Sequence, residues 1–353
     1  MGEPNPVALG AILTADAVSF GGERLDVADL ILLGLITLAW PRFEREVSRG
    51  LALERDGVET VSPAELKARA TQFRYERRLL SASEFTSWLA ARSLTVGDLA
   101  GVLGRALLRE RVPEGGGAAG PDELAGALRA EALCGGILRT LADAALERMA
   151  AAHRLGRLAQ PGGEVAAERV EASLADALGR HAAGLATLGE DALRRRLRRL
   201  WAYQDARAAL REQVAEPAAV HRQLAGHGLD WVCLQGRRLR FAAEGAAREA
   251  RALMADDGLG AEEVAVIAGT VATTESLYLD EVSGQIAGAL AAVMPGEISA
   301  PWVQDGEWNV LVVSAKTAPS AEDPVLRERA IEELLAGVLR RQAAGRAVVL
   351  GAF

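Results

Sequence analysis

Helix-start signals recur along the first third of this chain of 353 residues and limit what that part can fold into. In a capping box, a Ser, Thr or Asp side chain caps the helix, and an acidic side chain three residues later bonds back to the backbone. Ser62-Pro63-Ala64-Glu65 has this pattern with Pro at the first helical position, and Thr95-Val96-Gly97-Asp98 has it with Thr and Asp. Together with Asp26 and Ser83-Glu84, these signals predict four helices in series, over 26–55, 62–80, 83–92 and 95–111.

Ala and Leu supply most of the apolar residues, and aromatic residues make up only 4% of the chain, which favours helices. Further helices are predicted over 121–158, 164–179, 191–213, 243–255, 281–293 and 324–344, with linkers at Gly115–Gly117 and Pro161–Gly163. The leucine spacing of the first bundle recurs 94 residues later, where Leu188, Leu193 and Leu197 match Leu94, Leu99 and Leu103. This is either a repeat or a chance match in a Leu-rich chain.

Several kinds of partner and site are not expected. The longest apolar run, Leu30 to Trp40, holds about eleven residues, against the roughly 20 of a membrane-spanning helix. A formal charge of −8 is unlike the basic footprint of a nucleic-acid-binding protein. Two cysteines cannot form a thiolate metal site alone, and the His221-x5-His227 spacing does not place both rings on one helix face. The sequence therefore predicts no membrane, nucleic-acid, metal or cofactor binding.

The N-terminal segment carries Glu3 and no Lys or Arg before Arg24. A secretory signal would begin with a basic region, so a cytoplasmic location is expected.

Strand patterns are confined to two regions. Near the N-terminus, Ala8–Leu13 and Ala17–Phe20 are followed by Gly21-Gly22, which predicts a hairpin or an extended arm. The second region begins after Gly228, where strands are predicted at Trp231–Leu234, Arg237–Phe241 and Trp308–Val313, 264–271 is ambiguous, and a last short strand covers Ala347–Leu350. Residues 229–318 are thus expected to form a small α+β domain among helices.

Residues 279–313 resemble the C-terminal half of a parvulin (PpiC-type) peptidyl-prolyl isomerase domain. The resemblance rests on Met294-Pro295-Gly296-Glu297-Ile298-Ser299-Ala300-Pro301 and the strand Gly306-Glu307-Trp308-Asn309-Val310-Leu311-Val312-Val313. Arg237–Phe241 and Ala243–Leu253 are similar to the first strand and helix of that family. The helices of 49–111, with Glu84–Leu89 and Leu94–Leu99, are similar to the N-terminal domain of SurA-like chaperones.

The resemblance implies a mostly helical α+β fold, in which the C-terminal helix and strand complete a SurA-like helical domain. The expected parts are an N-terminal helical domain (1–112), a second helical segment that could repeat it (121–228), a degenerate parvulin-like domain (229–318) and the C-terminal helix and strand (319–353). As a corollary, Ala347–Leu350 is expected to pair with the strand region near Ala11–Phe20.

The chain departs from the parvulin pattern at the positions that matter for catalysis. Parvulins place two His residues beneath the substrate proline, and Arg238 and Asn309 occupy these positions here. Val282 and Ile286 stand where the family has the Met and Phe of the proline pocket. Because amide rotation has a barrier near 18–20 kcal/mol that a shaped, dry pocket must lower, we expect weak or no isomerase activity. The catalytic residues stay unknown.

The residues themselves indicate a peptide-binding surface. Val282, Ile286 and Leu290 share one helical face, and Trp302 and Trp308 flank the Gly-Glu-Ile-Ser turn in a chain poor in aromatics. The alternative for each is ordinary core packing.

The predicted function is a peptide-binding chaperone or foldase-like accessory protein. Its client would be an unfolded polypeptide, or a precursor peptide with its modifying enzyme in a ribosomal-peptide maturation system, as the resemblance implies. The alternatives are an active isomerase or a peptide-modifying enzyme, for which Tyr278, Asp280, Glu281 and Cys233 are candidates beside Arg238, and a helical scaffold. The oligomeric state stays open.

One basic run offers a second binding hypothesis. Arg194-Arg195-Arg196-Leu197-Arg198-Arg199-Leu200-Trp201 either grips an acidic peptide or is the solvated side of a helix whose leucines face inward.

Overall fold

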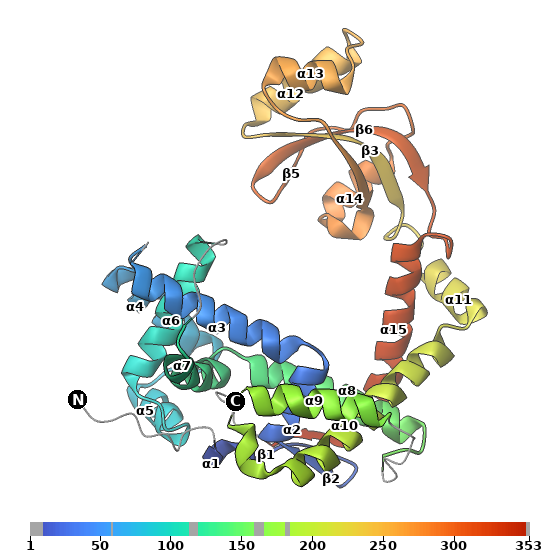
Figure 1. Ribbon diagram of the computed structural model, residues 1–353. Coiled ribbons are helices and arrows are strands. Elements are labelled where there is room, and N and C mark those ends of the chain that lie inside the picture. The colour runs from blue at the N-terminus through green and yellow to red at the C-terminus, as the bar shows by residue number, and fades with distance from the viewer. Residues whose placement is uncertain (1–9, 58, 113–118, 159–165, 181–183, 351–353) are drawn as a thin grey trace. The chain divides into compact units, whose positions relative to one another are not determined.

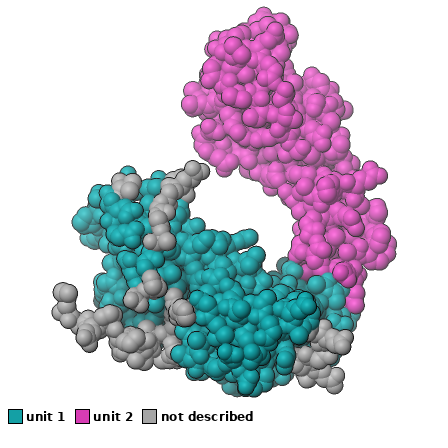
Figure 2. Space-filling view, viewed as in Figure 1, with its two compact units in different colours: residues 1–210, 339–353 teal, residues 211–338 magenta. Residues whose placement is uncertain are grey.

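The computed structural model describes residues 10–57, 59–112, 119–158, 166–180 and 184–350. The predicted linkers at Gly115–Gly117 and Pro161–Gly163 lie outside these residues, as does the start of the Ala8–Leu13 run. The chain divides into two compact units, which Figure 2 colours separately. Unit 1 contains residues 1–210 and 339–353, and unit 2 contains residues 211–338, so the boundary falls within two long helices, α10 (Glu190–Val214) and α15 (Pro324–Ala343).

Unit 1 is built on an apolar helix, α2 (Val27–Ile36), which is buried along nearly its whole length. Its start follows from the sequence, since Asp26 caps the backbone of Asp29 and the Asp29 carboxylate accepts from the Asp26 N–H. The apolar run that starts at Leu30 is therefore a core helix. In the described residues, no helix is long and apolar enough to cross a membrane.

The helix predicted over 26–55 is in fact two helices, α2 and α3 (Ala39–Asp56), with Leu38 between them in a left-handed conformation (φ +61°). The cause is Pro41. It has no N–H to donate to the Thr37 carbonyl, and in a continuous helix its ring would clash with that carbonyl. The helix predicted over 121–158 is likewise two, α7 (Pro121–Cys134) and α8 (Ile137–Arg154), because Gly136 turns left-handed (φ +84°).

The other helices of unit 1 agree more closely with their start signals. Ser62, Ser81 and Thr95 each cap a helix through a complete capping box. Ser81 caps the second of these helices, two residues before the predicted start at Ser83. The bounds are α1 (Gly10–Leu13), α4 (Pro63–Glu76), α5 (Ala82–Ala91), α6 (Val96–Arg111), α9 (Ala167–Gly179) and the short 3-10 helix η2 (Leu185–Leu188).

A three-stranded antiparallel sheet joins the two ends of the chain in unit 1. β1 (Asp16–Phe20) turns at Gly21-Gly22 into β2 (Glu23–Asp26), so a hairpin is present. The extended run predicted at Ala8–Leu13 is wrong over its described part, because residues 10–13 form the helix α1. On its other edge, β1 pairs with β7 (Ala347–Val349), with Val18 opposite Val349 and Phe20 opposite Ala347. The predicted pairing of the C-terminal strand is therefore confirmed.

Removing β7 tests how much this pairing contributes. A chain ending at Gly345 loses the strand and leaves the β1 edge without partners, so we expect unit 1 to lose about 2 kcal/mol of stability, or about 4–8 °C in Tm. A chain ending at Leu350 keeps β7 and is the matched control. Equal melting temperatures for the two truncations, measured by calorimetry, would contradict this role of β7.

Unit 2 contains a four-stranded antiparallel sheet in the order β4-β3-β6-β5. Its strands are β3 (Cys233–Phe241), β4 (Thr273–Tyr278), β5 (Trp302–Gln304) and β6 (Glu307–Thr317). The two strands predicted before Phe241 are one strand with a register shift beside Gly236, where a Cβ would lie 2.1 Å from the Val312 carbonyl oxygen. The sequence did not predict β4, because its first four residues, Thr-Thr-Glu-Ser, are polar, or β5, which has only three residues.

Helices cover both faces of this sheet (Figure 1). α12 (Glu244–Ala255) and α13 (Ala261–Ala268) pack on Leu239, Phe241 and Val310, while α14 (Gly284–Ala291) packs on Leu234 and Leu311. α11 (Pro217–His227) and α15 enclose a further apolar cluster around Trp231 and Ile331. The predicted fold class is thus confirmed: the chain is mostly helical α+β, and its C-terminal segment returns to the helical unit.

The Pro-Gly-Glu-Ile-Ser turn has a clear structural role. Gly296 adopts φ +90°, which favours glycine, and its N–H donates to the Val313 carbonyl at 2.7 Å. The backbone then runs beside β6, where Ser299 N–H donates to the Leu311 carbonyl and the Ser299 hydroxyl accepts from Leu311 N–H, both at 2.9 Å. The turn therefore fixes the path from α14 into β5.

Candidate functional site

A cavity of about 480 Å³ opens in unit 2 between α14 and the β5 end of the sheet. Its walls are mostly apolar. They are formed by Gln285, Ile286, Ala289, Leu290 and Val293 on and after α14, Ala300 and Pro301 before β5, and Trp302, Val303 and Trp308 on the strands. The structure thus brings together four of the five residues predicted to bind peptide, namely Ile286, Leu290, Trp302 and Trp308.

Val282, the fifth, does not line this cavity. The helix predicted over 281–293 begins only at Gly284, after a 3-10 turn, η3 (Leu279–Glu281), and Val282 itself is extended (φ −119°, ψ 159°). The i, i+4, i+8 spacing of Val282, Ile286 and Leu290 is therefore not a single helical face. Val282 instead packs at the edge of the apolar cluster under α14.

The two tryptophans are also part of the core. Trp302 is only 5% exposed and lies with Leu290 in the cluster under α14, while Trp308 is partly buried against the cluster under α12. The Trp302 indole N–H is buried and has no acceptor among the described residues. An unmet buried donor is costly, so this N–H is a local defect in the packing beside the cavity.

Behind Trp302 lies a polar group that is unusual for a sheet interior. Arg238 on β3 is only 7% exposed, and its guanidinium lies 5.5 Å from the Trp302 ring centroid. Its Nε donates to Asn309 Oδ1 at 2.7 Å, one terminal nitrogen donates to Glu275 at 3.0 Å and the other donates to Gln304 at 3.1 Å. The two residues predicted to stand at the parvulin histidine positions are therefore in direct contact.

Asn309 is completely buried and is held at both ends of its amide. Its oxygen accepts from Arg238, and its nitrogen donates to the Glu307 carbonyl at 2.8 Å. Both side chains are thus occupied by bonds within the sheet. Moving either side chain toward a substrate amide would break one or more of these bonds.

Sequence reasoning missed two members of this network. Glu275 lies on β4, where it also pairs with Arg240, and Gln304 ends β5. Neither strand was predicted, and neither residue stands at a motif position. The one available signal was Arg238 itself, because a buried guanidinium requires acceptors on neighbouring strands.

None of the candidate catalytic residues, Arg238 included, lines the cavity. Asp280 and Glu281 form ion pairs with Arg329 at 3.1 and 2.7 Å. Tyr278 donates to Asp323 at 2.9 Å, and burial, together with this bond, raises the pKa of Tyr278 to about 12. Cys233 is buried and free, and burial raises the pKa of its thiol. These groups serve the packing between the sheet and α15 and form no nucleophile or base pair.

In the basic run, the leucines face inward as one interpretation predicted. Leu193, Leu197 and Leu200 are buried in unit 1, and Arg194 pairs with Glu171, Glu190 and Asp191. Within the described parts of the chain, no group of three or more His, Cys, Asp or Glu residues is placed to hold a metal ion.

Comparison with known proteins gives structural neighbours only, since no family model and no curated protein matches the sequence. The peptidylprolyl isomerase PrsA from Bacillus anthracis is 13% identical, with 56% of this chain and 94% of that chain covered and a TM-score of 0.29. The foldase PrsA from Lactococcus lactis is 11% identical, with 96% of both chains covered and a TM-score of 0.28.

A SurA-like chaperone structure from Campylobacter jejuni is 9% identical, with 96% of this chain and all of that chain covered, at a TM-score of 0.18. Each of these superpositions is loose, so the function is inferred from the side chains of this protein.

The Arg238 network makes a stability prediction. Asn309→Ala leaves the buried Arg238 Nε without its acceptor, so we expect a loss of about 2 kcal/mol, or roughly 30-fold faster exchange of β3 and β6 amides. Hydrogen–deuterium exchange of these strands measures the effect.

Gln304→Ala is the matched control, because Gln304 lies at the more open edge of the network where water can replace it. Equal, small changes in exchange for both variants would show that the buried Asn309 contact does not hold the sheet together.

Proposed function

We propose that unit 2 binds an extended, apolar segment of a peptide or unfolded polypeptide in the cavity between α14 and β5, and that it holds this segment without efficient prolyl isomerisation. The observation that carries the proposal is the combination of an apolar cavity with a polar pair, Arg238 and Asn309, that does not line it and is held in place by bonds within the sheet.

The cavity wall supports a peptide ligand in two ways. β5 is an edge strand of the sheet, and its outer backbone groups have no strand beside them among the described residues. An extended peptide can pair with such an edge and place alternate side chains in an adjoining pocket. Val303 on this edge is 44% exposed, and the unmet indole N–H of Trp302 lies next to it in sequence.

The absence of strong isomerisation follows from the same geometry. Accelerating rotation about an amide requires stabilisation of a twisted state with groups aimed at that amide. Arg238 gives N–H bonds to three residues of the sheet, and Asn309 uses both ends of its amide. The cavity thus offers apolar contact and shape, and its polar groups stabilise the protein itself.

The finer parts of the function stay predictions from the sequence. They are a precursor peptide and its modifying enzyme as the client system, and a cytoplasmic location. An active isomerase or peptide-modifying enzyme is disfavoured because the charged and nucleophilic candidates on β3, β4 and η3 are engaged elsewhere.

A pair of matched variants tests the cavity as the binding site. Ile286→Ser places a hydroxyl on the α14 wall, and we expect at least a tenfold weaker Kd for a fluorescent extended apolar peptide, because burial of a side chain of this size stabilises by about 1.5–3 kcal/mol. Anisotropy titration measures the Kd.

Val266→Ser on α13 is the control, since Val266 is 82% exposed, is apolar and does not line the cavity. Binding that weakens equally in both variants, or in neither, would place the peptide elsewhere and overturn the proposal.

A further inference from the structure

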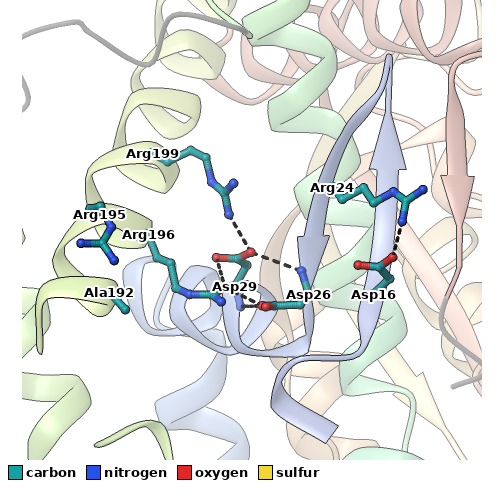
Figure 3. A pocket seen from close by; sticks show the side chains of 8 residues that line it. All are labelled: Asp16, Arg24, Asp26, Asp29, Ala192, Arg195, Arg196 and Arg199. Carbon is teal, nitrogen blue, oxygen red and sulfur yellow. Dashed lines mark hydrogen bonds and ion pairs between the residues drawn. The ribbon is translucent and has the colours of Figure 1, made fainter. Parts of the chain in front are cut away.

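Unit 1 contains a cavity of about 510 Å³ with a very different lining (Figure 3). Four guanidinium groups and three carboxylates surround it. They belong to Asp16 on β1, Arg24 on β2, Asp26 and Asp29 at the start of α2, and Arg195, Arg196 and Arg199 on α10, with Ala192 completing the wall. The local formal charge is therefore positive, in a chain whose formal charge is −8.

Two of these carboxylates form ion pairs with α10. Asp29 is only 1% exposed, and it pairs with Arg196 at 2.9 Å and with Arg199 at 2.7 Å. Asp26 pairs with Arg196 at 2.7 Å. Burial raises the pKa of Asp29, while Arg199 and Arg196 act in the opposite direction. These two aspartates hold α10 against the start of α2.

Guanidinium donors remain after these bonds are counted. Arg195 has no carboxylate within ion-pair distance among the described residues, and no dashed line reaches it in Figure 3. The Arg195 guanidinium is therefore available to a ligand on the cavity wall.

The guanidinium of Arg24 can also bind a ligand with little loss of stability. Arg24 pairs with Asp16 at 2.7 Å, but the two side chains are 66% and 46% exposed. Exposed ion pairs contribute only about 0–1 kcal/mol, so Arg24 can exchange Asp16 for a ligand with little loss. Arg24 and Arg195 come from different elements, β2 and α10, so the donors available to a ligand are not confined to one wall of the cavity.

We propose that this cavity binds the carboxylates of an acidic peptide segment through Arg195 and Arg24. Guanidinium groups bind carboxylates by paired, charge-assisted hydrogen bonds, and two such groups on separate elements suit a ligand with more than one carboxylate. The volume exceeds what a single small anion fills, which favours a segment of chain. This site is separate in chemistry from the apolar cavity of unit 2 and does not depend on the function proposed for it.

The test uses a fluorescent, N-acetylated hexaglutamate peptide and the full chain at low ionic strength, with hexaglutamine as the uncharged comparison. We expect saturable binding of hexaglutamate and no binding of hexaglutamine. Arg195→Gln is expected to raise the Kd for hexaglutamate at least fivefold. Arg198→Gln is the matched control, because this substitution removes the same charge from the same helix. Arg198 is exposed and does not line the cavity. Circular dichroism verifies that both variants fold.

Equal weakening in the two variants would mean that the hexaglutamate senses only the general charge of α10, and it would overturn the site. Absence of hexaglutamate binding, or its complete displacement by an equal concentration of inorganic phosphate, would also overturn it. Because hexaglutamate has no apolar side chain, none of these results bears on the cavity of unit 2.

Discussion

The α+β part of this protein depends on one buried guanidinium. Arg238 stands in the interior of a four-stranded sheet, where an unpaired charge would cost several kcal/mol. The sheet meets this requirement by supplying one acceptor from each of its other three strands, Glu275 on β4, Asn309 on β6 and Gln304 on β5. The short edge strands are thus tied to the two long central ones by side-chain bonds as well as by the backbone ladder.

This constraint shapes what the adjoining cavity can do. Its polar groups are committed to the sheet, so the face that a ligand meets is made of Ile286, Leu290 and the tryptophans. Unit 1 shows the opposite arrangement, because there the buried Asp29 pairs with two guanidinium groups of α10, and Arg195 stands at the cavity wall with no ion pair among the described residues. The chain therefore has an apolar cavity in unit 2 and a cationic cavity in unit 1. In each unit, a buried charged side chain beside the cavity is held by ion pairs and hydrogen bonds.

Local signals explain which parts of the fold could be predicted. Capping boxes at Ser62 and Thr95 act over three residues, and the structure has the helices that they start. The break before Pro41 and the short strands β4 and β5 depend on packing and pairing across the chain, and single-residue patterns do not contain that information. The resemblance to parvulins singled out Arg238 and Asn309, because both stand at predicted histidine positions. It did not point to Glu275 and Gln304, because these residues reach Arg238 only through the pairing of the strands.

The central claim is that a peptide bound in unit 2 is held and not isomerised, and exchange spectroscopy on a proline-containing peptide tests it directly. With a small amount of the protein present, the account predicts line broadening of the peptide's apolar residues upon binding, while cis and trans proline signals interconvert at the uncatalysed rate of tens of seconds or slower. Exchange cross-peaks between the two isomers that appear only when the protein is added would show catalysis and contradict the account.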